Sequence, residues 1–269
     1  MQFKKDLRCI QIKDIESIST YEWLELSFFQ NFLKKYVIQG ILSGSTVLYS
    51  INSKDQVTGI FIYSQEEREG AIFAKDVESF SLLAPHGRNV SIFSELKLPI
   101  KGDRYLIMEG DISVGSDVQS CGNLIEVLQI SDLPDLMECV KSVYSFAQSS
   151  SVRASLQDGD ICFIARINNH IAGFAFLSIA NHDGRFPLIG VLQEYHGLGI
   201  GNDLMRARMS FLKKMGVRRV FSEIEEHNVR SLELSKKFGF KPVGQLWLYG
   251  PDSGSWSATI GALGQSGVN

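Results

Sequence analysis

The sequence predicts a mixed α+β protein of two domains in tandem, and three observations support this. The chain has 269 residues, and single domains usually run to about 100–200 residues. Strand-like and helix-like apolar spacing alternates in both halves. Residues 110–123 are rich in glycine, serine and aspartate, which is a linker composition. We therefore expect one domain over residues 1–115 and a second over residues 124–250.

In the first half, apolar residues recur at helical spacing until Gly40 and Gly44. Strand-like runs follow, the first two joined by the polar turn Ser53-Lys54-Asp55. The expected elements are a helix over 21–42, strands over 46–51, 57–63 and 69–75, a helix over 90–98 and a strand over 105–108.

The second half repeats this plan. Ser131-Asp132-Leu133-Pro134 has the capping side chain and early proline of a helix start. Gly216 and Gly239 are placed to end helices as left-handed caps. The tail over 251–269 is rich in glycine and serine, so we expect loose packing there. The expected elements are strands over 124–130, 161–167, 171–179, 186–192, 217–224 and 243–249 and helices over 131–147, 202–215 and 228–238.

The two halves also share a local pattern. The run Val57-Thr58-Gly59-Ile60-Phe61 matches Ile171-Ala172-Gly173-Phe174-Ala175 at an offset of 114 residues, and Gly70 and Gly184 keep that offset. Any two α+β halves share strand-turn-strand patterns. The sequence therefore leaves open whether the first half is a degenerate copy of the second.

Composition excludes several classes of function. The net charge of −3 lacks the basic excess typical of nucleic-acid binding. No apolar run reaches the length of a membrane span or a signal peptide, so we expect a cytoplasmic protein without a membrane partner. No pair of cysteines has the spacing of a zinc or dithiol motif, so we expect no bound metal. We expect the cysteines to be buried thiols in a reducing compartment. The four cysteines are Cys9, Cys121, Cys139 and Cys162.

The most informative segment is a strand, a glycine-rich turn and a helix over residues 186–204. Helix N-termini carry unpaired N–H groups and a partial positive charge. Glycines let several N–H groups converge without a Cβ in the way. The segment is therefore a candidate anion cradle, with a turn that uses glycine for packing alone as the alternative.

Two nucleotide-binding motifs do not fit this turn. The dinucleotide pattern G-x-G-x-x-G fails because its third glycine falls at Asn202 or Leu204. The P-loop fails because Asn202-Asp203 stands where Lys-Ser/Thr is needed. The spacing instead resembles the pyrophosphate loop of the GNAT acyltransferase superfamily, Gln/Arg-x-x-Gly-x-Gly/Ala, with a histidine at its first position. The residues that carry this resemblance are His196, Gly197, Leu198, Gly199, Ile200 and Gly201.

A second signature of that family lies downstream. The family shows an acidic strand residue, then Asn-x-x-Ala/Ser-x-x-Leu-Tyr-x-x-x-Gly-Phe. Glu223, Asn228, Ser231 and Gly239-Phe240 match it in order and spacing. The resemblance covers about residues 124–250 and is faint in the first half, whose equivalent loop after His86-Gly87 lacks both later glycines. It implies tandem GNAT-like domains, each with a mixed, mostly antiparallel sheet flanked by helices.

The resemblance also implies a cosubstrate and a reaction. The cosubstrate is acetyl-CoA, and an amine acceptor attacks its thioester directly. The pyrophosphate is expected on the loop His196–Gly201, and Asn228 is expected to contact the cofactor. The pantetheine arm is expected on a splayed strand formed by Ile189, Gly190 and Val191.

Glu223 and Ser235 are the candidate catalytic residues. Glu223 holds the position of a general base in some family members; alternatively it faces solvent or pairs with Arg218 or Arg219. Ser235 stands where the family has a tyrosine that often protonates the leaving thiolate, and a serine hydroxyl is much less acidic than a phenol.

Two functions are consistent with these residues. The first is an N-acetyltransferase for a small molecule or protein, and the second is a CoA-binding regulatory or scaffold protein that has lost turnover. The acceptor is not readable from the sequence. The first half is expected to wall the acceptor groove or to form the contact of a homodimer.

Overall fold

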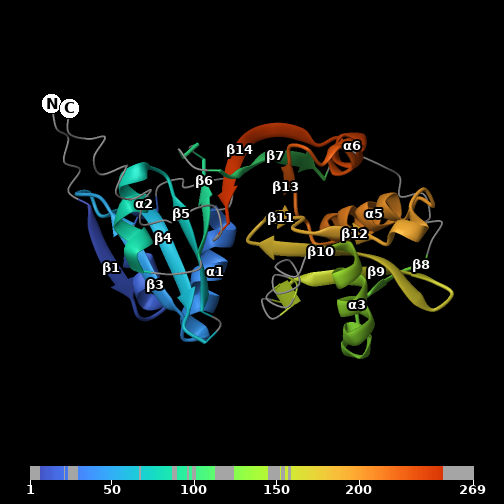
Figure 1. Ribbon diagram of the computed structural model, residues 1–269, viewed down its shortest axis with the longest axis horizontal. Helices are drawn as coiled ribbons and strands as arrows, with labels where there is room; N and C mark the ends of the chain where they lie inside the picture. Colours follow the sequence, from blue (N-terminus) through green and yellow to red (C-terminus); the bar gives the residue numbers. More distant parts are fainter. Residues whose placement is uncertain are drawn as a thin grey trace. The chain divides into compact units, whose positions relative to one another are not determined.

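The protein forms two compact units, Met1–Leu106 with Gly244–Asn269, and Ile107–Val243. Each contains a sheet flanked by helices, so the predicted tandem α+β fold is confirmed (Figure 1). The predicted linker beyond residue 112 and the predicted tail lie outside the described residues. The computed structural model describes residues 7–20, 22–23, 30–66, 68–86, 90–95, 97–98, 101–112, 124–144, 152, 155–156 and 159–250.

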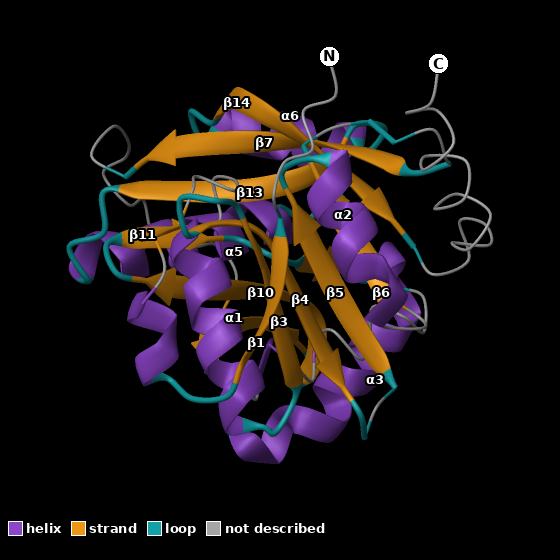
Figure 2. Cartoon of the chain, turned by 90° about the vertical axis from the view of Figure 1, so that its left-hand side faces the viewer, coloured by secondary structure: helices purple, strands orange, loops and turns teal. Residues whose placement is uncertain are grey.

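The first unit has the strand order β1-β3-β4-β5-β6-β14, and β2 pairs with β4. Its sheet is antiparallel except for the pairs β5–β6 and β2–β4, and Figure 2 shows β1, β3, β4 and β5 side by side. The strands are β1 (Arg8–Ile12), β2 (Glu22–Trp23), β3 (Thr46–Ile51), β4 (Gln56–Ser64), β5 (Glu69–Ala74), β6 (Val90–Ser94) and β14 (Lys241–Tyr249). The helices are η1 (Glu16–Thr20), α1 (Gln30–Leu42), α2 (Val77–Leu83) and η2 (Ala84–His86).

Two predictions for the first unit are wrong. The helix expected over 90–98 is wrong, because Val90–Ser94 forms strand β6, which pairs with β5 on one edge and β14 on the other. Buried and half-buried residues alternate along β6 because successive side chains of a strand point to opposite faces of the sheet. The helix expected from residue 21 begins at Gln30, and Glu22–Trp23 is strand β2. Two elements were not predicted, β1 and the short helix α2, which Asp76 caps by accepting from Ser79 N at 2.8 Å.

The second unit has the strand order β7-β13-β11-β10-β9-β8, with β12 paired to β10. Strand β7 (Asp103–Asp111) begins in the first unit and ends in the second. The other strands are β8 (Leu124–Val127), β9 (Ile161–Ile167), β10 (His170–Ala180), β11 (Asp183–Arg185), β12 (Ile189–Val191) and β13 (Arg219–Glu225). The helices are η3 (Ile130–Asp132), α3 (Leu133–Val143), η4 (Gln193–Tyr195), α5 (Ile200–Lys214) and α6 (Val229–Lys237).

Most second-half elements form where the sequence predicts them. The turn between β9 and β10 holds Asn168 and Asn169 at positive φ of 49° and 66°, a conformation that asparagine tolerates. Gly216 and Gly239 take left-handed φ of 71° and 82° after α5 and α6. The strand expected over 186–192 is shorter than predicted, because only Ile189–Val191 forms strand β12, and β11 (Asp183–Arg185) was not predicted.

Helices α3 and α5 cover opposite faces of the second sheet (Figure 1). Phe174 and Phe176 on β10 pack with Leu136 and Val140 of α3 in one buried cluster. On the other face, a Cβ placed on Gly173 would lie 3.1 Å from Ile200 of α5. Glycine at this strand position therefore lets α5 approach the sheet closely.

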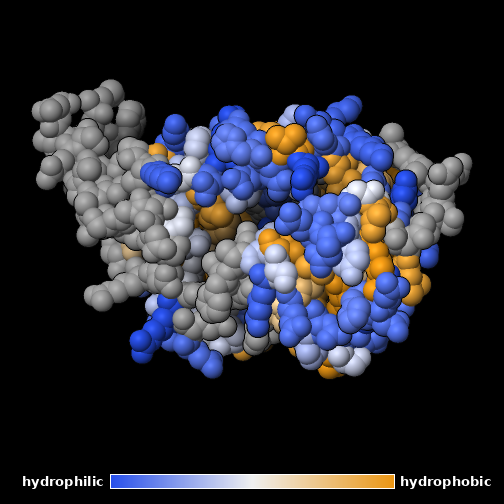
Figure 3. All heavy atoms as spheres, turned by 45° about the vertical axis from the view of Figure 1, so that its right-hand side comes forward, coloured by the Kyte–Doolittle hydropathy of each residue, from blue (hydrophilic) through white to orange (hydrophobic). Residues whose placement is uncertain are grey.

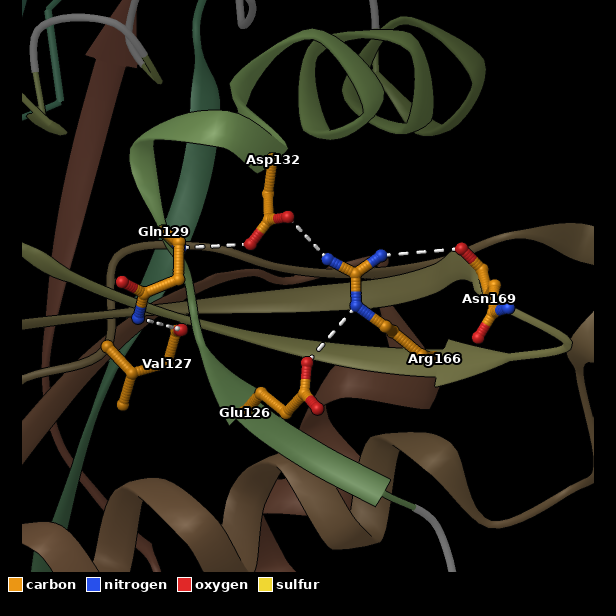
Figure 4. A network of polar contacts seen from close by, with 6 residues as sticks. All are labelled: Glu126, Val127, Gln129, Asp132, Arg166 and Asn169. Carbon is orange, nitrogen blue, oxygen red and sulfur yellow. Dashed lines mark hydrogen bonds and ion pairs between the residues drawn. The ribbon is translucent and has the colours of Figure 1, made fainter.

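An ion-pair network fixes the start of α3 against the sheet (Figure 4). Arg166 on β9 donates to Glu126 of β8 at 3.1 Å and to Asp132 at 2.6 Å. Asp132 also accepts from Gln129 N at 3.0 Å. These contacts bind the edge strand β8 and the helix start to the same side chain.

The strand patterns of the two units correspond. In each, three antiparallel pairs are followed by a parallel pair: β1-β3-β4-β5-β6 and β8-β9-β10-β11-β13. A common origin of the two halves stays a prediction. The first unit also takes the end of β14, because Trp247, Leu248 and Tyr249 pair with β6.

Candidate functional site

The glycine-rich turn leads directly into α5. Gly197 and Gly199 adopt left-handed φ of 84° and 80°, and Gly199 is the N-cap of the helix. A Cβ on either glycine would meet no atom within 4 Å, so open space lies in front of the turn. Leu198 between them is exposed, whereas Ile200 is buried and anchors the helix start. The glycines therefore shape the backbone around an open space at a helix N-terminus, which suits an anion.

The helix α6 packs beside this turn. A Cβ on Gly201 would lie 3.6 Å from the Leu234 side chain. Arg230 of α6 donates to His196 Nδ1 at 3.1 Å, and His196 Nε2 lies 3.0 Å from Val191 O. With Nδ1 accepting from Arg230, the proton of a neutral His196 is on Nε2 and is donated to Val191 O. Arg230 was not among the residues predicted for this site.

Strand β12 has a strand partner on one side only among the described residues, and that partner is β10. Phe176 N donates to Leu188 O, and Leu192 N donates to Ala172 O, both at 2.9 Å. Backbone groups alternate in direction along a strand. The N–H and C=O groups of Ile189 and Val191 therefore point away from β10, toward the open side of β12.

Strand β13 passes this open side after it leaves β11. The last paired residues are Arg185 and Phe221. Beyond that point β12 pairs with β10, whereas β13 continues to Glu225. The pairings of the two strands therefore differ beyond this point, and the free backbone donors of β12 face what we call the gap between β12 and β13.

Both carbonyl groups of β12 that face the gap already accept hydrogen bonds from side chains. Tyr144, which directly follows α3, donates its hydroxyl to Ile189 O at 2.6 Å, and His196 donates to Val191 O. Burial raises the pKa of Tyr144 to about 12, so this hydroxyl stays protonated at neutral pH. A ligand entering the gap therefore finds N–H groups of β12 as its main backbone partners.

Glu223 lies on β13, two residues beyond its last pairing with β11. One carboxylate oxygen accepts from Arg185 Nε at 3.0 Å, and the other is buried without a hydrogen-bond partner. Burial raises the pKa of Glu223, and the nearby Arg185 cation only partly opposes this. Glu223 therefore does not face solvent, and its partner is Arg185 rather than Arg218 or Arg219. Arg219 binds Asp183 instead, at 3.1 Å.

The other two candidates on α6 differ in position. Asn228 is exposed and caps the helix by accepting from Ser231 N at 3.1 Å. Ser235 is buried, with 2% of its surface exposed. Among the described residues, no hydrogen bond joins the Ser235 hydroxyl to Glu223 or to the glycine turn.

Arg208 is a feature of this site that the sequence analysis missed. It lies on α5 within an apolar stripe that includes Leu204, Met205, Met209 and Leu212, all buried. A single basic residue within such a stripe was a visible signal, because charged residues are rarely fully buried without a partner. Its contacts are described below.

No group of three or more His, Cys, Asp or Glu side chains among the described residues is placed to hold a metal ion. No helix in the same part of the chain is both long and apolar enough to cross a membrane.

Part of this chain is similar to known proteins. Residues 130–240 match the family model described as the acetyltransferase (GNAT) family. A Bacillus subtilis (strain 168) protein provisionally named a ribosomal protein bS18-alanine N-acetyltransferase is 31% identical over 87 residues, covering 32% of this chain and 58% of its own. An N-alpha-acetyltransferase of Sulfurisphaera tokodaii is 29% identical over 103 residues, covering 34% of this chain and 62% of its own. The chain thus spans about three fifths of each relative.

A solved structure extends the likeness across both units. It is a tandem GNAT protein from the clavulanic acid biosynthesis pathway, with a TM-score of 0.62 and 12% sequence identity. The match covers 93% of this chain and 100% of that one. At this identity the likeness concerns the fold.

Proposed function

We propose that the second unit moves an acetyl group from acetyl-CoA to an amine, because residues 130–240 match the model of the acetyltransferase (GNAT) family. The observation that carries this proposal is the pair of left-handed glycines, Gly197 and Gly199, that opens α5 beside the gap between β12 and β13. A helix N-terminus with open space before it favours a diphosphate, and an open strand edge favours the amide-bearing arm of the same ligand.

The residues present fit acetyl-CoA. Backbone N–H groups of the turn His196–Gly201 would hold the pyrophosphate, with Arg230 as a nearby cation. The N–H group of Val191 would hold a carbonyl group of the pantetheine arm, and the N–H group of Ile189 would face the thioester carbonyl. The NH2 group of Asn228 is the part of that side chain left for the cofactor, because its oxygen caps α6.

Acetyl-CoA supplies an activated thioester carbonyl to the acceptor amine. As the new C–N bond forms and the C–S bond breaks, the thiolate leaves and the nitrogen must lose a proton. Glu223 is the proposed acceptor of that proton, directly or through water, because burial keeps its pKa above the ordinary value. Ser235 is a poor candidate for protonating the thiolate, because it is buried and its hydroxyl is weakly acidic.

The acceptor class we propose to test first is the α-amine of a peptide. One relative is named an N-alpha-acetyltransferase, and the name of the other describes N-acetylation of an alanine of ribosomal protein bS18. An α-amine has a pKa of about 7.7–8.0, well below the value of about 10.4 for a lysine. A sizeable fraction is therefore neutral at physiological pH, and a weak carboxylate base is sufficient.

The alternative is a CoA-binding protein without turnover, and the burial of Ser235 favours it. Calorimetry with acetyl-CoA, followed by a thiol-release assay with peptides of varied first residue and with small amines, separates the two. Binding together with thiol release supports the acetyltransferase. Binding without release on any amine supports the alternative, and absence of binding contradicts both.

A further inference from the structure

Arg208 is the largest fully buried side chain of the described residues, with 1% of its surface exposed. Its NH1 group donates to Phe176 O at 3.1 Å and to Leu188 O at 3.3 Å, and NH2 lies 3.5 Å from Met205 Sδ. The guanidinium carbon lies 3.9 Å from the centre of the Phe186 ring. No ion pair within the described part of the chain includes Arg208, and its Nε is buried without an acceptor.

This arrangement is costly for a purely structural residue. A buried cation without a carboxylate partner loses the favourable free energy of its hydration. Interactions with carbonyl dipoles and an aromatic face replace only part of that free energy. Leu188 O already accepts from Phe176 N at 2.9 Å. The arginine therefore adds a second, charged donor to a carbonyl that the sheet alone satisfies.

The position of that carbonyl links Arg208 to the gap. In a trans peptide the C=O and N–H groups of one unit point in opposite directions. The unit joining Leu188 to Ile189 has its C=O toward β10 and Arg208, so the Ile189 N–H points to the open side of β12. A cation at the carbonyl end draws electrons from the unit and makes the N–H a stronger donor.

We propose that Arg208 is a positioning residue that polarises the Ile189 N–H to stabilise negative charge on the oxygen of the acyl group being transferred. This inference rests on the proposed acetyltransferase function. As the amine bonds to the carbonyl carbon, the C=O electron pair moves onto oxygen and returns when the C–S bond breaks. Arg208 touches no reacting atom and acts through one peptide unit.

The first test needs no ligand. Val191 N–H faces the same gap as Ile189 N–H, but among the described residues no cation donates a hydrogen bond to Gly190 O, the carbonyl of its peptide unit. In the free full-length protein, we expect the amide proton of Ile189 to resonate downfield of that of Val191 and to move upfield in Arg208→Met. If the Ile189 amide proton resonates at or upfield of Val191 in the wild-type protein, the proposal is overturned.

The second test measures the bound acyl group. Isotope-edited infrared spectroscopy of acetyl-CoA carrying a 13C carbonyl, without acceptor amine, reports polarisation of that carbonyl. We expect Arg208→Met to move the carbonyl stretch to higher frequency and to lower kcat roughly ten- to hundredfold, within the loss seen when an oxyanion donor is removed, with acetyl-CoA affinity unchanged. Arg208→Lys keeps the charge and should restore part of both, and Lys213→Met removes an exposed charge of the same helix as the control.

The outcomes separate this proposal from the proposed function. Unchanged carbonyl frequency and unchanged kcat in Arg208→Met would overturn the role of Arg208 while leaving the acetyltransferase intact. Absence of acetyl-CoA binding or of turnover in the wild-type protein would contradict the proposed function, whereas the amide comparison in the free protein would still stand. Should Arg208→Met fail to fold, the wild-type amide comparison and Arg208→Lys decide the question.

Discussion

Opposing influences act on the Glu223 carboxylate. Burial disfavours its charge, and Arg185 at 3.0 Å favours it. Burial is the larger influence, so the pKa is raised. A base with a raised pKa binds the proton of an acceptor ammonium more strongly than an exposed glutamate does.

The rate of acetyl transfer should therefore depend on the ionisation of Glu223. The carboxylate form accepts the proton, so activity is present above the pKa and is lost as pH falls through it. Because that pKa is raised, we expect kcat to fall at a pH above the ordinary glutamate value of about 4.3. Glu223→Gln should remove this acidic limb and lower kcat with acetyl-CoA affinity unchanged, as measured by pH–rate profiles. The exposed Glu233→Gln is the control, and identical profiles for wild type and Glu223→Gln would exclude Glu223 as the base.

The hydroxyl of Tyr144 links the end of α3 to the backbone of β12 through its hydrogen bond to Ile189 O. Removing it in Tyr144→Phe leaves Ile189 O without that donor and should reduce the free energy of unfolding by about 1 kcal/mol. Urea denaturation measures this, and Tyr195→Phe serves as the control. A loss in Tyr144→Phe no greater than in the control would show that the bond adds nothing to stability.

At the scale of elements, α5 has a left-handed glycine near each end. Gly199 precedes the helix and Gly216 follows it, both with φ near +75° and with no atom within 4 Å of an added Cβ. Alanine at either site has the same backbone penalty of about 1–2 kcal/mol. Comparing alanine variants at the two sites therefore distinguishes the effect of backbone strain from the effect of filling the space in front of the turn.

We expect Gly199→Ala and Gly216→Ala to lose similar stability, but only Gly199→Ala to lose acetyl-CoA affinity. The methyl group at residue 199 projects into the space proposed for the diphosphate, whereas residue 216 lies at the other end of the helix. Calorimetric titration with CoA, beside thermal unfolding, measures both effects. Equal affinity for the two variants would contradict the placement of the diphosphate.

Sequence patterns predicted elements best where one local signal decided the structure. The Asn168-Asn169 turn and the glycines after α5 and α6 are such cases, because few residues other than glycine and asparagine adopt positive φ easily. The helix predicted over 90–98 was wrong, because Val90–Ser94 is a strand. Five positions are too few to distinguish the period of a strand from that of a helix. Helix α2 has seven residues, which is too short for a clear period.

Some residues of the candidate site could be predicted from local sequence signals, and others could not. The turn His196–Gly201 was found because its glycines serve a backbone need visible in the sequence. The contacts of Glu223 with Arg185 and of Arg208 with Leu188 join residues 38 and 20 positions apart. Such contacts depend on how strands and helices pack, and sequence spacing carries no information on that.

At the scale of the whole molecule, the surface is largely hydrophilic on the face in Figure 3, with separate apolar areas. The chain divides between units within two strands, β7 and β14. The end of β14 belongs to the first unit, where Tyr249 is fully buried and its hydroxyl accepts from Leu98 N at 2.6 Å. The end of the last strand therefore contributes to the core of the first unit.

Tyr249→Phe should consequently destabilise the first unit without affecting the site. It leaves the buried Leu98 N–H without its acceptor, which costs about 1–3 kcal/mol. Urea unfolding measures this loss against Tyr63→Phe, and acetyl-CoA affinity at 25 °C should not change. A loss of affinity in Tyr249→Phe alone would contradict the independence of the site from this contact.

The position of β14 in the chain sets an order for folding on the ribosome. The strand that completes β6 is translated only after all of residues 107–243, on the order of ten seconds later at 5–20 residues per second. During that interval one edge of β6 has no partner strand from β14, and an unpaired edge can recruit another nascent chain. We expect the second unit to finish folding first, and a chaperone that shields strand edges to raise the yield of intact protein.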